Sequence, residues 1–186
     1  MKNIESITLI AIAILVMVVN AFVYSPTQAA VEAGRGGPTN KWSQQPNAAG
    51  ITTATTLSEQ EVADLAAAIQ EEYTAMNTYQ AVMDELGNVQ PFSRIARSEQ
   101  QHVNALIRVA ERFGIDVPEN AGEVAEIAWS TLEDACQMGV TFEQMDAALY
   151  DELLANTTNP VLIRVYTNLQ RASLNNHLPA FEACNP

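Results

Sequence analysis

Four stretches of the chain place apolar residues at alternating steps of three and four, which is the spacing of one face of an α-helix. They cover residues 58–86, 92–113, 131–153 and 160–184. The first begins with Ser58 and Glu61, the spacing of a capping box, and ends at Gly87. The second begins after Pro91 and ends at Gly114. The pattern therefore predicts four helices and an all-α fold.

The third helix has two alternative starts and one alternative interruption. It begins at Ser130 or Thr131, each with an acidic residue three positions later as the capping partner. Another interpretation breaks it at Gly139 and restarts it two residues later. We favour a continuous helix, because a broken one would be too short to match its neighbours. The segment 114–130 before it contains Pro and Gly and predicts a long crossover between the second and third helices.

The fourth helix has a clear start and a less regular apolar face. An Asn-Pro pair at 159–160 is a typical helix start. A face through Ile163 and a neighbouring face through Leu162 fit its apolar residues almost equally well. Pro179 removes one backbone donor, so we expect it to kink or end the helix near Asn175.

Acidic residues and both histidines of the chain interrupt these apolar faces. They are Glu72 on the first helix, Glu99 and His102 on the second, Glu143 and Asp146 on the third, and His177 on the fourth. A buried carboxylate destabilises a fold by several kcal/mol unless it is paired or neutralised, and nearby like charges add to this. No lysine or arginine lies on the same faces. One or two divalent cations would neutralise the cluster, and mixed carboxylate and imidazole ligands favour iron or manganese, with zinc also suitable.

The ligand spacing matches part of a known arrangement. Ferritin-like carboxylate proteins place one Glu on each of two helices and a Glu-x-x-His pair on each of the other two. Here the first and third helices supply the single Glu residues, and the second helix supplies one pair. The fourth helix departs from the pattern, because Leu174 stands three residues before His177. Asp146, one turn beyond Glu143, could replace the missing carboxylate; otherwise the second metal position is weak or empty.

Several segments together resemble a known family. The most specific is residues 92–102, with the sequence FSRIARSEQQH. Further matching positions are Glu71, Glu72 and Tyr79, then Gly139, Glu143 and Asp146, then Ser173, Asn176, His177, Leu178, Ala180 and Phe181. Over about residues 58–184 the chain resembles the ferritin-like family catalogued as domain of unknown function 2202, related at fold level to rubrerythrin. The resemblance implies a ferritin-like four-helix bundle with a dinuclear metal centre and supplies no established reaction.

We expect the metal centre to react with peroxide or dioxygen, as rubrerythrin-like peroxidases and ferroxidases do. Its partners would then be a small oxidant and an external electron donor, because the chain has no CxxC pair for a metal site that supplies electrons. Two alternatives stay open, namely a non-catalytic protein that binds or sequesters metal, and a metal-free interaction bundle on a tether. Whether the protein is an enzyme is therefore undecided by the sequence.

Two tyrosines repeat the spacing of the acidic residues. Tyr79 follows Glu72 by seven residues, and Tyr150 follows Glu143 by seven. As candidate catalytic residues they could hydrogen-bond the groups around the metal or carry an oxidising equivalent. We favour the simpler interpretation, in which each is a core tyrosine with a satisfied hydroxyl.

The two cysteines lie at matching distances from the candidate ligands. Cys136 precedes Glu143 by seven residues, and Cys184 follows His177 by seven. If the third and fourth helices are antiparallel, both thiols lie roughly 10 Å from the metal layer on the same side. This placement favours a disulfide over two buried free thiols in an exported protein.

The N-terminal part differs in composition from the four helical stretches. Residues 1–30 contain Lys2, an apolar run and small residues near the end, which is typical of a signal peptide or of an uncleaved membrane anchor. Residues 31–57 are rich in Gly, Pro, Gln, Asn and Thr, which predicts a flexible linker before the bundle of residues 58–184. We therefore expect an exported protein, secreted or tethered.

The charge balance limits the partners. Nine Lys and Arg residues against 22 Asp and Glu residues give a net charge of −13. Such a surface repels a phosphate backbone, so general nucleic-acid binding is excluded. Membrane contact is expected only through residues 1–30 if they are retained, and the sequence leaves a homodimer open.

Overall fold

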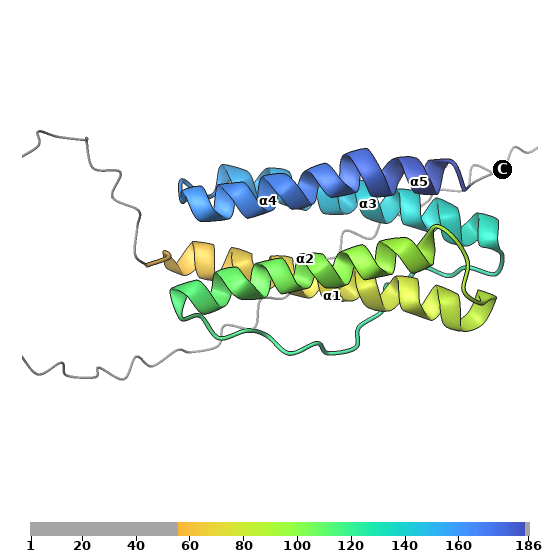
Figure 1. Cartoon of the computed structure of the whole chain (residues 1–186), viewed down its shortest axis with the longest axis horizontal. Coiled ribbons are helices and arrows are strands. Elements are labelled where there is room, and N and C mark those ends of the chain that lie inside the picture. The colour runs from red at the N-terminus through yellow and green to blue at the C-terminus, as the bar shows by residue number, and fades with distance from the viewer. Residues whose placement is uncertain (1–55, 185–186) are drawn as a thin grey trace, which may run out of the picture. The chain divides into compact units, whose positions relative to one another are not determined.

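The computed structural model describes residues 56–184, and within this range the protein is helical and has no strand (Figure 1). The elements are α1 Glu59–Leu86, α2 Phe92–Phe113, α3 Leu132–Ala155, α4 Pro160–Ala172, the π-helix η1 Ser173–His177 and α5 Leu178–Glu182. The all-α prediction is confirmed. The predicted signal or anchor of residues 1–30 and nearly all of the predicted linker lie outside the described residues. None of the described helices is both long and apolar enough to span a bilayer.

Local capping signals set the helix starts. Ser58 and Glu61 form the predicted capping box at α1, with the Glu61 amide donating to Ser58 Oγ at 3.2 Å. At α3 the cap is Thr131 rather than Ser130, and its partner is Asp134. The α3 helix continues through Gly139, so the continuous helix is confirmed.

The long crossover between α2 and α3 runs alongside α1. It is held there by hydrogen bonds from Gln70 Nε2 to the Glu119 carbonyl at 3.0 Å and from the Ala125 amide to Thr78 Oγ1 at 2.9 Å. Because the crossover returns along the length of the helices, α2 and α3 run in the same direction (Figure 1). The bundle thus consists of α1, α2, α3 and a fourth helical stretch made of α4, η1 and α5, and the middles of all four lie at one level.

Two clusters of apolar side chains lie on either side of that level. The Leu65 cluster includes Leu65, Ile69, Leu106, Leu153, Leu162 and Tyr166. The Phe92 cluster includes Tyr79, Phe92, Ile95, Phe142 and Phe181. On α1, Glu72 lies between Ile69 of the first cluster and Ala75 of the second, and the other helices repeat this order. A layer of buried polar residues thus separates two apolar cores.

The last helix differs from its prediction in face and continuity. Leu162 and Leu169 of one face are buried whereas Ile163 of the other is 39% exposed, but Tyr166, Ser173 and His177 of the face through Ile163 are also buried, so the inward side combines both faces. Helix geometry does not end near Asn175; instead the chain widens into η1, and the Leu178 amide donates to the Ser173 carbonyl. Pro179 then falls in the first turn of α5, where a helix tolerates a residue without an N–H.

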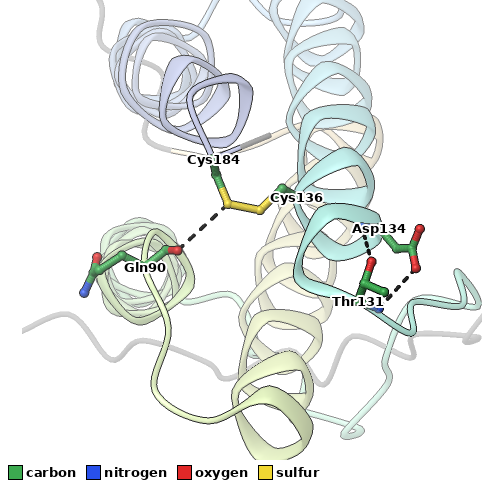
Figure 2. Close-up of a disulfide and its surroundings, with 5 residues drawn as sticks. All are labelled: Gln90, Thr131, Asp134, Cys136 and Cys184. Carbon is green, nitrogen blue, oxygen red and sulfur yellow. Dashed lines mark hydrogen bonds between the residues drawn. A yellow bond between two sulfur atoms is a disulfide. The ribbon is translucent and has the colours of Figure 1, made fainter. Parts of the chain in front are cut away.

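A disulfide and a close helix contact fix the end of the chain. Cys136 of α3 is bonded to Cys184, which follows α5, with Cα atoms 5.9 Å apart, so the predicted disulfide is confirmed (Figure 2). One turn along α3, Gly139 faces the ring of Phe181, and a Cβ at this glycine would lie 2.5 Å from that ring. The missing side chain therefore lets α5 pack directly on the α3 backbone.

Candidate metal centre

The six predicted metal ligands lie in the polar layer between the two apolar clusters. Glu72 comes from α1, Glu99 and His102 from α2, Glu143 and Asp146 from α3, and His177 from η1. None is more than 8% exposed. At this burial water cannot solvate their charges, so each must be satisfied by a protein group, a proton or a cation.

Glu99 is the centre of this arrangement. Its Oε2 lies 2.7 Å from His102 Nδ1, and its Oε1 lies 3.0 Å from His177 Nδ1. The two imidazole rings stack with centroids 5.3 Å apart. A single carboxylate thus contacts both histidines through its two oxygen atoms.

Two further carboxylates, called the outer carboxylates here, each contact one of the two histidines. Glu72 Oε2 lies 3.1 Å from His102 Nδ1, and Glu143 Oε2 lies 3.3 Å from His177 Nδ1. The side chains form two groups that could each hold a metal ion, and both groups contain Glu99. The members of the first group are Glu72, Glu99 and His102, and those of the second are Glu99, Glu143 and His177.

The two tyrosines hydrogen-bond the outer carboxylates in a crossed pattern. The Tyr150 hydroxyl of α3 donates to Glu72 Oε1 of α1 at 2.5 Å, and the Tyr79 hydroxyl of α1 donates to Glu143 Oε1 of α3 at 2.6 Å. Both rings are fully buried. Each hydroxyl is therefore satisfied, and each holds the carboxylate oxygen that does not face a histidine.

Asp146 lies apart from the two groups. Its Oδ2 accepts a hydrogen bond from Ser173 Oγ at 2.5 Å, while its buried Oδ1 has no hydrogen-bond partner among the described residues. Ser173 stands four residues before His177 in the π-helix, facing the layer. The structure therefore places a serine on the fourth helix and the acid on α3, and one carboxylate oxygen remains unpaired.

Two further residues close to the centre were not among the predicted site residues, although Glu71 was a position matching the family. Ser98 Oγ lies 3.0 Å from His177 Nε2 and 3.4 Å from His102 Nε2, so it contacts the outer nitrogen of both rings. Its position four residues before His102 on α2 is the signal that could have identified it. Burial and the charge of Glu143 raise the pKa of the partly buried Glu71, which adds an acid beside the layer.

Contacts between Glu99 and the two histidines shift their pKa values in opposite directions. Burial opposes ionisation of Glu99, but hydrogen bonds with His102 and His177 outweigh it and lower the pKa of Glu99 to about 2. Burial also opposes charging of the imidazoles. Hydrogen bonds to the carboxylates outweigh it and raise the pKa of His102 to about 11 and that of His177 to about 9.

The remaining acids bind protons more tightly than usual. Burial and then the charge of Glu99 raise the pKa of Glu72 to about 8, and burial raises the pKa of Glu143. Burial and the charge of Glu72 raise the pKa of Asp146 well above its usual range. In the metal-free protein, protons therefore neutralise part of the cluster, and cations could take their place.

The donor set fits a hard or borderline cation. Carboxylate and imidazole atoms are the ligands that suit iron and manganese, and Asp146 Oδ1 is a buried oxygen that lacks a partner. The ion pairs among the described residues join only histidine and glutamate, and Arg94, Arg97 and Arg108 of α2 are exposed. Among the described residues no lysine or arginine pairs with these carboxylates, so only the two histidines and their protons compete with a cation.

Comparison with known proteins places the chain among relatives of unassigned activity. It is 28% identical to the uncharacterized protein MJ0754 of Methanocaldococcus jannaschii over 140 residues, 67% of this chain and 75% of that protein. The crystal structure of hypothetical protein MJ0754 from Methanococcus jannaschii matches with a TM-score of 0.62 and 25% identity, covering 78% of this chain and 85% of that one. The model of the family described as uncharacterized protein domain (DUF2202) matches residues 61–184 of this chain. Because this match spans well over half of the chain, the protein belongs to the DUF2202 family.

Proposed function

We propose that the protein is a ferritin-like bundle that binds a dinuclear iron or manganese centre and reacts with peroxide or dioxygen. The observation that carries the proposal is the pair of buried acid and histidine groups that share Glu99. The helix order, with its long crossover between α2 and α3, agrees with a ferritin-like arrangement. Two nearby cations sharing one carboxylate are the arrangement expected of such centres.

Each side of the cluster offers a separate ligand set. Glu72 with His102 would hold one ion, Glu143 with His177 would hold the other, and Glu99 would contact both. Bound iron or manganese would supply Lewis acidity and the electrons that reduce the oxidant. An external donor would replace the electrons that the metal has given up.

The surrounding residues would orient the ligands and exclude water. The hydroxyls of Tyr79 and Tyr150 each fix one oxygen of an outer carboxylate and leave the other for a cation. The Leu65 and Phe92 clusters close the layer along the helix axes. A water-poor site strengthens every charge interaction within it.

One observation favours a second function, non-catalytic metal binding or sequestration. The fourth helix supplies no carboxylate to the layer: its buried residue one turn before His177 is Ser173, which hydrogen-bonds Asp146. A metal position with fewer ligands is weaker, which suits reversible binding better than turnover. A metal content that exchanges readily and shows no response to peroxide would favour this function.

We also propose that the protein acts outside the cytoplasm. The signal-like residues 1–30 motivate this location, and the Cys136–Cys184 disulfide agrees with an oxidising compartment. Fractionation of the native host would show where the protein is found, and mass measurement of the recovered protein would show whether residues 1–30 are removed.

Metal analysis of the purified protein tests the central proposal. We expect about one or two iron or manganese ions per chain in the wild type. The Glu99→Gln variant keeps the shape of the side chain but removes the shared charge, so its metal content should fall by at least about half. Glu111→Gln, an exposed acid on the same helix, is the matched control and should retain wild-type metal. Near-zero metal in the wild type after metal-supplemented expression would overturn the proposal.

A second measurement separates reaction with oxidant from storage. Peroxide added to the reduced, iron-loaded protein should produce a ferric absorbance that returns to baseline with an added reductant. Metal that stays bound without this cycle would support the sequestering function instead.

A further inference from the structure

A cavity opens on the surface between α2 and η1, beside the candidate metal centre. Its volume is about 390 Å³, and its walls are formed by Arg94, Ile95, Ser98, Asn175, Asn176 and His177. It therefore includes one candidate ligand, His177, in its wall. A volume of this size holds several small molecules, since one water occupies about 30 Å³ of liquid.

Ser98 connects this cavity to both sides of the centre. Its hydroxyl lies within hydrogen-bonding distance of Nε2 of His177 and of Nε2 of His102, while the Nδ1 atoms of the same rings face the carboxylates. Ser98 and His177 therefore line the cavity and also contact the centre, and Ile95 is the one apolar residue in the wall.

The other approaches to the layer along the helix axes are closed. The Leu65 cluster fills one end of the bundle and the Phe92 cluster fills the other. A second cavity of about 520 Å³ lies along α1 and α2, but its walls contain none of the six candidate ligands. The larger cavity is therefore not a route to the centre.

The mouth of the first cavity carries polar groups that are free to bind. Arg94, Asn175 and Asn176 are exposed, and their side chains have no hydrogen-bond partner among the described residues. Arg94 is a positive group on a chain with a net charge of −13. This lining favours a small hydrogen-bonding or anionic molecule over an apolar one.

We propose that the cavity between α2 and η1 is the access port through which small hydrogen-bonding molecules of the size of hydrogen peroxide reach the metal centre. The inference rests on the proposed function and narrows it, since a polar port selects peroxide over dioxygen. Arg94 and the two asparagines admit the molecule, and Ser98 lies at the inner end. No covalent step is assigned to these residues.

Azide binding to the metal-loaded protein tests the port, because azide is a small anion that binds such centres without turnover. The Asn176→Phe variant adds a bulky ring at an exposed position of the cavity wall, where we expect the fold to tolerate it; an unchanged melting temperature checks this. A plug slows entry and exit alike, so azide association and dissociation rates should both fall by about tenfold or more while the equilibrium constant stays unchanged. Asn88→Phe, which fills the second cavity, is the matched control and should leave both rates at the wild-type values.

The outcomes distinguish this inference from the proposed function. If the variant retains metal and its azide rates equal those of the wild type, the port is wrong and the metal centre stands. Loaded wild-type protein that binds no azide would likewise overturn the port. A wild-type protein that takes up no metal at all would overturn both. If the Asn176→Phe variant reacts more slowly with peroxide than the wild type but reacts with dioxygen at the wild-type rate, this would support the selection of peroxide over dioxygen by the port.

Discussion

The buried histidines carry protons in the metal-free protein that a bound cation must displace. The pKa of His102 is raised to about 11, that of His177 to about 9 and that of Glu72 to about 8, so all three hold a proton at neutral pH. A metal binds only the unprotonated form of each ligand. Raising the pH removes protons from the metal-free state, so apparent metal affinity must increase with pH.

This proton competition predicts a measurable pH dependence. Between about pH 6 and about pH 8, Mn²⁺ affinity should rise by up to tenfold per pH unit for each proton displaced. Calorimetric titrations in two buffers of different ionisation enthalpy would count the released protons. Affinity that does not change with pH, together with no proton release, would show that the cluster is not protonated as described.

Ser98 is expected to act as a positioning residue for both imidazoles. Its hydroxyl contacts both Nε2 atoms, which leaves the Nδ1 atoms toward the carboxylates. Removing such an outer partner typically lowers metal affinity by about tenfold to a hundredfold, and we expect this for Ser98→Ala. Ser98→Thr keeps the hydroxyl and should restore affinity.

The readout for Ser98 must separate positioning from folding. Ser93→Ala removes an α2 hydroxyl that instead accepts a hydrogen bond from Gln90, so it should leave affinity unchanged. The melting temperature of the metal-free protein should be similar in all three variants. If Ser98→Ala binds metal as tightly as the wild type, the hydroxyl has no role in orienting the rings.

At the residue scale, the spacing of apolar residues was enough to predict that the acids and histidines lie inside the bundle, because each occupies a regular position on an apolar face. It could not select which oxygen pairs with which ring, nor that Glu99 would be shared, since these depend on side-chain geometry between helices. Asp146 as a ligand stays a prediction; the structure pairs it with Ser173. Ser98 was overlooked because a serine near the interior is too common to stand out.

At the scale of elements, Gly139 determines how closely α5 approaches α3. An alanine at this position would favour helix by about 1 kcal/mol on propensity alone. Its Cβ, however, would lie 2.5 to 2.7 Å from three atoms of the buried Phe181 ring, and overpacking of this kind costs about 1–3 kcal/mol. The clash outweighs the propensity gain.

We therefore expect Gly139→Ala to lower the free energy of unfolding by about 1 kcal/mol, measured by urea denaturation of the metal-free protein. Gln144→Ala, at an exposed position on the same helix, should change it by no more than about 0.5 kcal/mol. A stabilised Gly139→Ala variant would mean that the ring of Phe181 moves away without cost.

The helix starts were predictable, whereas the phase of the last helix was not. Capping boxes at Ser58 and Thr131 are local signals, so one sequence is sufficient to find them. The π-helix η1 adds residues to one turn, which shifts the inward face between Leu162 before it and Phe181 after it. No single periodicity fits both sides, which is why two faces seemed almost equally good.

At the scale of the whole molecule, one polar layer joins all the long helices, from Glu72 to His177 along the chain. The resulting fold has its two apolar clusters on opposite sides of an acidic centre, so packing within a cluster does not by itself hold the layer together. At the Phe92 side the last helix segment is short, and the Cys136–Cys184 disulfide ties it to α3 (Figure 2). The covalent link therefore supports the segment that carries His177.

The disulfide closes a loop with a sequence separation of 48 residues. Loop-closure entropy for this length predicts that the bond stabilises the folded state by about 4 kcal/mol relative to the reduced chain. We expect the Cys136→Ala/Cys184→Ala double variant, and the reduced wild type, to unfold at a markedly lower urea concentration than the oxidised protein. In the variant, added reductant should have no further effect, which controls for other actions of the reductant. Alkylation should find no free thiol among the two cysteines before reduction. Equal midpoints for oxidised and reduced wild type would mean that the apolar packing of Phe181 alone fixes the end of the chain, and that the link adds nothing to the stability of the segment bearing His177.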